Sequence, residues 1–450
     1  MYSSYSSLQQ SQLAAQGYYD TQSTYLLVYA PGRSTALRAT LADQLHRKFR
    51  LADTLGSALT EGVDGVLLVS EDVECMSTAL MCFAKALQDG ADYAVCNAVF
   101  GFGGATALYQ SRAHLAQNRC ALVSRPLLER CRAAAKDPEN VTELLALAAQ
   151  FCAHPARIPQ ALLHYERDIC AEDAFSATGK RAFLMSHVLD MTGAPIVLVS
   201  AVPVLRSMGY EVVVLGPSDG GALQLFVDAG AAVITRPGIR ATPNLWGLAL
   251  CTDLVLVNTV VMARTVRALS GTAVPVLWWL HDAFAGYPHI AHQIPTKLAE
   301  NVRLYSVGHH AANAMHAVRP DFQIGQLIYG LPDYAAEDFP RCDLGYPADK
   351  PLFATVGSFE RRKGHDIFCA AIRLLPEEVR NKATFLFVGM AADKEMMDAV
   401  RSLTTDCPEN VFYCKRLSRD EIKNLMEQCT CLVCASRDDP MPTFVTEGLI

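Results

Sequence analysis

Short apolar segments that alternate with helical segments constrain the fold of this chain more than any other feature of the sequence. Strands are predicted at residues 182–186, 211–215, 231–235, 252–258, 274–280, 352–356, 384–388, 411–414 and 431–435. Strands that are apolar along their whole length are buried on both faces, which is typical of a parallel sheet covered by helices. The sequence therefore predicts an α/β protein with two doubly wound, Rossmann-like units in tandem.

The length of 450 residues indicates roughly two to three domains. The predicted divisions are a disordered tail rich in Ser, Gln and Tyr, a small α/β domain, a polar linker, and two Rossmann-like domains. They cover residues 1–24, 25–165, 166–180, 181–340 and 341–450, in that order. The chain stops inside its last strand–helix unit, so we expect the second Rossmann-like domain to be incomplete at its C-terminal end.

Composition excludes several classes of protein. Apolar residues make up 51% and charged residues 19%, which favours packed cores over disorder, and the net charge of -7 argues against a nucleic-acid binder. The 15 cysteines are scattered without a pattern typical of a metal site, which indicates reduced thiols and a cytoplasmic protein. No signal peptide opens the chain, and the longest apolar stretch, 194–205, is too short to span a membrane.

The last fifteen residues follow a predicted strand and carry two acidic residues. Asp439 and Glu447 flank seven residues, and Glu447 is expected to begin a helix. Ligands bind at the carboxyl ends of strands in open α/β sheets, and a helix N-terminus offers free N–H groups to anions. The two carboxylates would accept hydrogen bonds from sugar or ribose hydroxyls. The same residues are also typical of an ordinary helix start with acidic side chains.

A basic segment lies between another strand and its helix. Gly357 and Ser358 follow the strand, and Arg361, Arg362 and Lys363 precede the helix. Positive charge at a helix N-terminus is locally unfavourable, so an anionic partner such as a diphosphate is favoured over a merely solvated helix start.

Two further residues lie where strands end. His281 follows the strand at 274–280, and Gly193 belongs to the loop that follows the strand at 182–186. A buried structural histidine and a simple turn glycine are the alternatives to ligand binding at these positions.

Taken in order, these four pieces resemble the retaining family 4 glycosyltransferases, which have the GT-B fold, over residues 181–450. In that family the acidic pair is usually Glu and Glu, whereas Asp439 is one methylene shorter. Lys363 matches the family's lysine, but Ser358 stands where an arginine is usual, so Arg361 or Arg362 is the candidate substitute.

The resemblance implies two Rossmann-like domains facing a cleft, transfer with retention, and no required metal. Lys363 with Arg361 or Arg362 would stabilise the leaving diphosphate, Glu447 would hold the ribose, and His281 would orient the sugar. Asp439 and the backbone N–H groups of the segment Met441, Pro442 and Thr443 would hold the transferred sugar, with Gly193 near the donor phosphate.

Residues 60–165 resemble, more distantly, the family 2 glycosyltransferases, which have the GT-A fold. Asp72 and Glu74 follow a buried strand at 65–70, and carboxylates at a strand tip suit Mg²⁺ or Mn²⁺. The alternative is a capping cluster on a partial domain, so a metal is expected only if this domain is active.

We expect a glycosyltransferase that moves a hexosyl group from a nucleotide-diphosphate sugar to a saccharide or lipid-linked glycan, in cell-surface polysaccharide synthesis. It would act in the cytoplasm, with peripheral association at the inner face of the membrane as an option. The alternatives are a non-catalytic nucleotide-sugar or saccharide-binding relic of a tandem transferase, and a sugar-nucleotide epimerase on the same fold.

Overall fold

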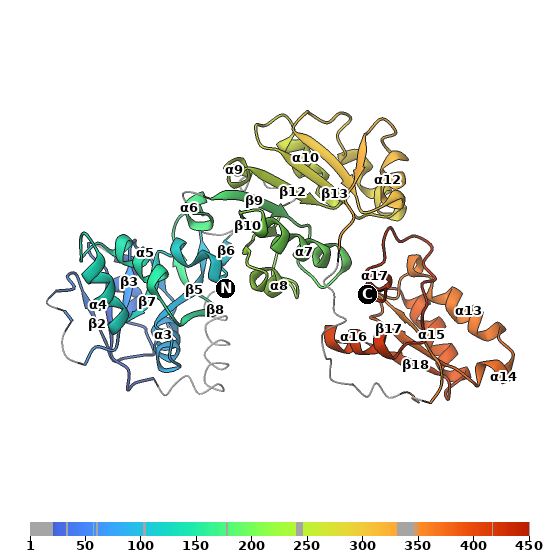
Figure 1. Ribbon diagram of the computed structural model, residues 1–450, viewed down its shortest axis with the longest axis horizontal. Coiled ribbons are helices and arrows are strands. Elements are labelled where there is room, and N and C mark those ends of the chain that lie inside the picture. Colours follow the sequence, from blue (N-terminus) through green and yellow to red (C-terminus); the bar gives the residue numbers. More distant parts are fainter. Residues whose placement is uncertain are drawn as a thin grey trace. The chain divides into compact units, whose positions relative to one another are not determined.

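Figure 1 shows the computed structural model of the chain, which consists of two compact units. The structure describes residues 21–32, 35–56, 58–59, 62–101, 105–176, 179–239, 246–330, 346, 349–415 and 417–449. The first unit extends to Asn258 and adds Arg264–Leu277 and Ala299–Val302. The second contains Thr259–Ala263, Trp278–Leu298 and Arg303–Ile450.

Helices and strands alternate along most of the first unit. Its strands are β1 (Leu26–Tyr29), β2 (Phe49–Ala52), β3 (Gly65–Val69), β4 (Glu74–Cys75), β5 (Tyr93–Phe100), β6 (Thr106–Tyr109), β7 (Cys120–Ser124), β8 (Pro155–Tyr165), β9 (Lys180–Met185), β10 (Tyr210–Gly216), β11 (Ala232–Thr235) and β12 (Leu254–Asn258). Its helices include α2 (Thr35–Leu41), α3 (Ala79–Gln88), η1 (Arg112–Gln117), α4 (Arg125–Ala134), α5 (Val141–Phe151), α6 (Ala171–Ala174), α7 (Gly193–Ser207), α8 (Leu223–Asp228) and α9 (Trp246–Leu250). Helix α10 (Ala263–Leu269) begins at the boundary with the second unit.

One sheet runs through this unit in the order β12-β9-β10-β11-β6-β5-β7-β3-β1-β2. Strands β12, β9, β10 and β11 are mutually parallel, as their continuous apolar character predicted. Strand β6 pairs antiparallel with β11, with Leu108 opposite Ile234. The segment predicted as a separate small domain therefore shares its sheet with the first Rossmann-like domain.

The predicted linker at 166–180 contains α6 and a buried ion pair. The Arg167 guanidinium donates to both Asp173 oxygens, at 2.8 and 2.9 Å, and Asp173 is 2% exposed. Of the predicted tail at 1–24, residues 1–20 lie outside the described residues. The next four form a turn into β1 in which the Thr24 N–H donates to the Thr21 carbonyl at 3.0 Å.

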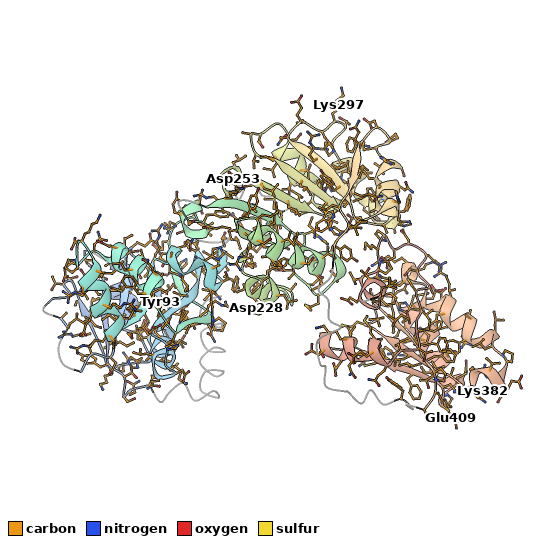
Figure 2. The ribbon with its side chains drawn as sticks, viewed as in Figure 1. Tyr93, Asp228, Asp253, Lys297, Lys382 and Glu409 are labelled. Carbon is orange, nitrogen blue, oxygen red and sulfur yellow. The ribbon has the colours of Figure 1, made fainter. Side chains whose placement is uncertain are left out.

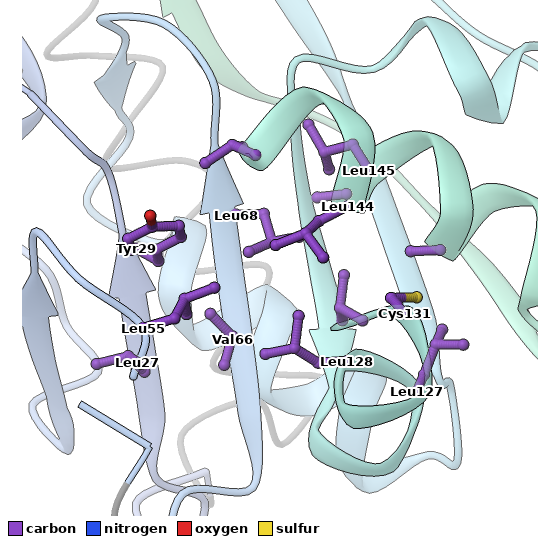
Figure 3. Packing of buried hydrophobic residues seen from close by; sticks show 14 of the residues in the cluster. Leu27, Tyr29, Leu55, Val66, Leu68, Leu127, Leu128, Cys131, Leu144 and Leu145 are labelled. Carbon is purple, nitrogen blue, oxygen red and sulfur yellow. The ribbon is translucent and has the colours of Figure 1, made fainter. Parts of the chain in front are cut away.

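The core of the N-terminal part lies between α4, α5 and one face of strands β1, β3, β5 and β7 (Figure 3). Leu144 of α5 and Leu128 of α4 pack toward Val66 and Leu68 of β3, and all four side chains are fully buried. Hydrophobic burial of this kind is the main driving force for folding this sheet and its helices together.

The second unit contains the other described helices and strands, among them a four-stranded parallel sheet. Its elements are η3 (Val260–Met262), β13 (Val276–Leu280), η4 (Phe284–Gly286), α11 (Tyr287–Ile290), η5 (Ala291–Gln293), β14 (Val302–Ser306), α12 (His309–His316), β15 (Ile324–Gln326), β16 (Leu352–Val356), η6 (Arg361–Lys363), α13 (His365–Leu374), α14 (Glu377–Arg380), β17 (Thr384–Val388), α15 (Lys394–Asp406), β18 (Val411–Cys414), α16 (Arg419–Gln428), β19 (Cys431–Leu432) and α17 (Thr443–Glu447). The first residues of β13 and β14 belong to the first unit.

The four-stranded sheet has the order β18-β17-β16-β19, with helices on both faces. Helices α13 and α15 cover one face through Phe368, Met397 and Val400, and α16 covers the other through Leu425. The predicted bounds of β16, β17 and β18 are confirmed. The prediction of a buried strand at 431–435 is wrong: β19 has only two residues and lies at one edge of the sheet, and Cys431 is exposed.

No helix among the described residues is long and apolar enough to cross a membrane.

We expect Leu144→Ala to lower the free energy of unfolding by about 2–5 kcal/mol, because it empties a fully buried site between α5 and the sheet. Leu374→Ala is the control, since Leu374 is 85% exposed, and its effect should stay within about 0.5 kcal/mol. Urea unfolding followed by circular dichroism measures both. Equal effects of the two substitutions would contradict this assignment of the core.

Candidate functional site

The basic segment and the terminal segment meet through an ion pair between Lys363 and Asp439. The Lys363 ammonium donates to Asp439 Oδ2, and the two side chains are 17% and 8% exposed. Both ends lie where strands of the parallel sheet finish, after β16 and after β19. The structure therefore brings together two of the predicted catalytic residues, which are 76 positions apart in the sequence.

Glycine residues allow the basic segment and the terminal segment to lie this close together. Gly364 follows Lys363 with a φ of 70°, a left-handed conformation that favours glycine. A Cβ atom at Gly364 would lie 1.9 Å from the Ala435 carbonyl oxygen, so any larger residue would push the two segments apart. Similarly, a Cβ atom at Gly389 would lie 1.8 Å from the carbonyl oxygen of Gly357, the predicted donor-binding glycine.

Arg437 of the terminal segment forms hydrogen bonds with the basic segment and with the helix after it. Its guanidinium donates to both oxygens of Asp366, each at 2.7 Å, and to the Arg361 carbonyl at 2.9 Å. The Arg437 N–H also donates to the Arg362 carbonyl at 2.7 Å. Bidentate guanidinium–carboxylate bonds are geometrically specific, so this contact fixes how the two segments align.

Asp438 contacts a third part of the same unit. Its Oδ1 lies 2.7 Å from His310 Nε2, and its Oδ2 accepts a hydrogen bond from the Ala285 N–H at 2.9 Å. The Phe284 N–H donates to Oδ1 at 3.3 Å. Burial alone would raise the pKa of Asp438, but these donors hold that pKa below its ordinary value. His310 and Asp438 lie 128 positions apart in the sequence, and the sequence analysis did not predict their contact.

The remaining basic residues differ in their surroundings. Arg361 is exposed, with a distant contact of 4.0 Å to Glu395, whereas the Arg362 Nε donates to Glu360 at 2.8 Å. Ser358 also donates to Glu360 through its hydroxyl. Burial would raise the pKa of Glu360, but the Ser358 bond and the nearby positive charges lower it.

The segment between the two acidic residues turns into a helix earlier than expected. Helix α17 begins at Thr443, with Pro442 before it, and Glu447 is its last residue. The prediction that Glu447 begins a helix is therefore wrong. Tyr329, which the sequence did not single out, is buried and donates through its hydroxyl to the Met441 carbonyl at 3.2 Å. Burial raises the pKa of Tyr329, and the charges of Glu447 and Asp439 add to this rise.

His281 leaves β13 beside Trp279, with ring centroids 4.6 Å apart. Its neighbour Asp282 accepts a hydrogen bond from the Val260 N–H at 2.5 Å. Burial raises the pKa of Asp282 to about 6, although hydrogen bonds from the backbone of Val260 and His281 oppose this rise. Directly before Val260, Thr259 has a φ of 73°, which is strained backbone for a β-branched residue.

The predicted residues of the first unit have structural contacts. Gly193 was predicted to lie in a loop, but it is the first residue of α7, directly after the N-cap residue Thr192. The Asp72 carboxylate accepts hydrogen bonds from Thr35 and from the N–H groups of Ala36 and Leu37, all at 3.2 Å, at the start of α2.

The second metal candidate, Glu74, lies 2.6 Å from His164 Nδ1. Within the described ranges, no group of three or more His, Cys, Asp or Glu side chains is arranged to hold a metal ion.

Comparison with protein families identifies two adjoining matches. Residues 178–316 match the glycosyl-transferase family 4 model, and residues 338–449 match the model for glycosyl transferases group 1. Comparison with curated proteins gives no match. Over the two matched regions, which together span more than half of the chain, the protein belongs to the family 4-like glycosyltransferases with a GT-B fold. It is accordingly a glycosyltransferase enzyme that uses a nucleotide sugar.

Solved structures with a similar fold are only distantly related in sequence. A trehalose-6-phosphate structure from E. coli bound with UDP-2-fluoro glucose is 10% identical, with 60% of this chain and 81% of that chain covered and a TM-score of 0.44. The catalytic domain of starch synthase IV from Arabidopsis thaliana, bound to ADP and acarbose, is 9% identical, with 61% and 81% covered and a TM-score of 0.44. The lipopolysaccharide outer core galactosyltransferase WaaB, in its apo form, is 14% identical, with 60% and 78% covered and a TM-score of 0.41.

A buried histidine beside the basic segment should make stability depend on pH. His365 is 2% exposed, and neither ring nitrogen has a hydrogen-bond partner among the described residues. Burial, assisted by the charge of Lys363, lowers the pKa of His365 to about 4 from an ordinary 6.5. As the pH falls from 6.5 to 4, the unfolded chain takes up this proton before the folded chain does, so stability falls.

We therefore expect His365→Leu to lose less stability than the parent protein between pH 7 and pH 5, by about 2 kcal/mol. Urea unfolding at the two pH values measures this difference. His289→Leu, at an exposed histidine, is the control and should behave as the parent. An equal loss in the parent and in His365→Leu would show that His365 is not the group responsible.

Proposed function

We propose that this glycosyltransferase transfers a hexosyl group, with retention of configuration, from a nucleoside-diphosphate sugar to a saccharide or lipid-linked glycan. The observation that carries the proposal is the Lys363–Asp439 pair, which places a cation and a carboxylate side by side at the ends of parallel strands. An ammonium group has three N–H donors. Lys363 therefore keeps its bond to Asp439 and still donates to a diphosphate.

The proposed roles follow from chemistry and from family resemblance. Lys363, with Arg361 or Arg362, stabilises the charge that grows on the leaving diphosphate. Arg361 is the better candidate of the two arginines, because it is exposed while Arg362 is engaged with Glu360. Gly357 and Ser358 form the turn that connects β16 to this basic segment.

On the sugar side, Asp439 and the backbone of Met441, Pro442 and Thr443 hold the transferred hexose, and Glu447 holds the ribose. His281 orients the hexose, and Gly193 lies near the donor phosphate. In the transfer step the bond from the anomeric carbon to the diphosphate oxygen breaks. A bond from that carbon to the acceptor oxygen forms on the same face, and the acceptor proton goes to the departing phosphate.

We place this reaction in the cytoplasm, at the inner face of the membrane, as part of cell-surface polysaccharide synthesis. The cysteines in the described part of the chain are free thiols, which suits a reducing compartment.

Titration calorimetry with UDP, GDP and dTDP tests the donor site. We expect one nucleotide to bind with a Kd of the order of micromolar, and Lys363→Ala and Glu447→Ala each to weaken it about tenfold or more, because each removes a charge-assisted hydrogen bond.

Matched controls are Lys382→Ala and Glu409→Ala, which remove exposed charges from the same unit (Figure 2) and should bind as the parent does. Unchanged binding in Lys363→Ala and Glu447→Ala would place the nucleotide elsewhere, and the absence of binding by the parent would count against the donor site itself.

Addition of EDTA tests whether side chains alone provide the positive charge. If Lys363 and Arg361 neutralise the diphosphate, turnover of the matching nucleotide sugar should stay within about twofold of its rate without the chelator. Proton NMR follows the rate and reads the anomeric configuration of fresh product, which we expect to equal that of the donor. Loss of turnover that is restored by Mg²⁺ or Mn²⁺ would contradict the metal-free mechanism, and an inverted product would contradict retention.

A further inference from the structure

Asp438 links segments of the second unit that are far apart in the sequence. Its carboxylate meets His310 of α12 at 2.7 Å and the N–H groups of Ala285 and Phe284, in η4, at 2.9 and 3.3 Å. The side chain is 17% exposed, so these bonds are partly shielded from water. The contact is therefore built from three donors that converge on one carboxylate.

The contacted segment continues directly from His281. At its start, Asp282 is bound to the Val260 N–H at 2.5 Å. At its end, Phe284 and Ala285 are bound to Asp438, and the Phe284 ring packs edge-on against the His310 ring with centroids 5.2 Å apart. The backbone that follows His281 is thus hydrogen-bonded at both ends. The partner at its start, Val260, is 22 residues away in the sequence, whereas the partner at its end, Asp438, is more distant, 153 residues from Ala285.

The two residues on either side of Asp438 also form hydrogen bonds. Arg437 joins Asp366 and the carbonyl of Arg361, and Asp439 accepts a bond from Lys363. The step from Asp439 to Asp438 is a single peptide unit. Asp438 consequently transmits the position of the Lys363–Asp439 pair to the segment that carries His281.

We propose that Asp438 is a positioning residue for sugar transfer, which sets His281 against the Lys363–Asp439 pair without itself touching the reacting atoms. This inference rests on the proposed function. It requires a carboxylate, because two oxygens serve three donors, and an asparagine offers a single acceptor oxygen.

A positioning role is distinguished from a donor-binding role by the step that it affects. The proposed nucleotide contacts, Lys363 and Glu447, do not depend on the Asp438 carboxylate. Loss of the carboxylate should therefore leave nucleotide affinity nearly intact and slow the transfer step, since small misplacement of a reacting group is costly. A merely structural role would lower stability and leave the kcat of the folded protein unchanged.

The experiment compares Asp438→Ala and Asp438→Asn with the parent in the chain of 450 residues. Amide hydrogen exchange of Phe284 and Ala285 reads the contact directly and needs no substrate. We expect their exchange to rise about tenfold or more in Asp438→Ala and by less in Asp438→Asn. With hexose donors that carry the nucleotide identified by calorimetry, kcat should fall on the order of 100-fold in Asp438→Ala, while the nucleotide Kd stays within about threefold.

Asp406→Ala is the matched control, because it also removes one carboxylate from an ion pair of this unit, with Arg373 at 2.6 Å. It should leave exchange at Phe284 and Ala285, and kcat, unchanged. If Asp438→Ala does not fold, His310→Phe takes its place, because it keeps the ring contact with Phe284 and removes the N–H donor.

Exchange and kcat within about twofold of the parent in Asp438→Ala would overturn the positioning role alone. Faster exchange with unchanged kcat would also overturn it, by showing that the contact is structural. No turnover by the parent with any of the tested donors would instead overturn the proposed function and the positioning role with it.

Discussion

The candidate site depends on three consecutive side chains, each of which has its own hydrogen-bond partners. Arg437 binds Asp366, Asp438 binds His310 and two backbone N–H groups, and Asp439 binds Lys363. Because Asp439 is 8% exposed and Lys363 17%, removing either partner would leave a poorly solvated charge, which is far more destabilising than losing a surface pair. The alignment of the basic and acidic segments therefore follows from charge pairing more than from apolar packing.

The N-terminal part of the first unit uses its acidic residues differently. Asp72 accepts bonds at the start of α2, Glu74 pairs with His164, and Glu71 accepts from Arg167 at 2.7 Å. Because these carboxylates already accept hydrogen bonds, a divalent cation would have to displace these contacts before binding. Their role in metal binding stays a prediction, whereas their hydrogen bonds join the segment 71–74 to α2, to β8 and to Arg167.

The sequence predicted local elements better than contacts between them. Strands β16, β17 and β18 were predicted with the observed bounds because they are apolar on both faces and are flanked by helices. The strand at 431–435 is shorter than predicted, since only Cys431 and Leu432 pair with β16, and α17 begins before Glu447, at Thr443 directly after Pro442. Asp438 contacts His310, 128 residues away, and Asp439 contacts Lys363, 76 residues away. A pattern within a short stretch of sequence does not predict contacts between residues so far apart.

The strain at Thr259 bears on how His281 is held. A φ of 73° with a ψ of 160° is a conformation essentially restricted to glycine, at a cost of about 1–3 kcal/mol. Hydrogen bonds offset this cost: the Trp278 indole donates to the Thr259 carbonyl, and the Thr259 N–H donates to the Trp279 carbonyl, both at 2.8 Å. The next residue, Val260, donates its N–H to Asp282, so the strained turn is also bound to the segment that follows β13. The Thr259 backbone is therefore restrained by hydrogen bonds with both tryptophans of β13, the strand that His281 directly follows.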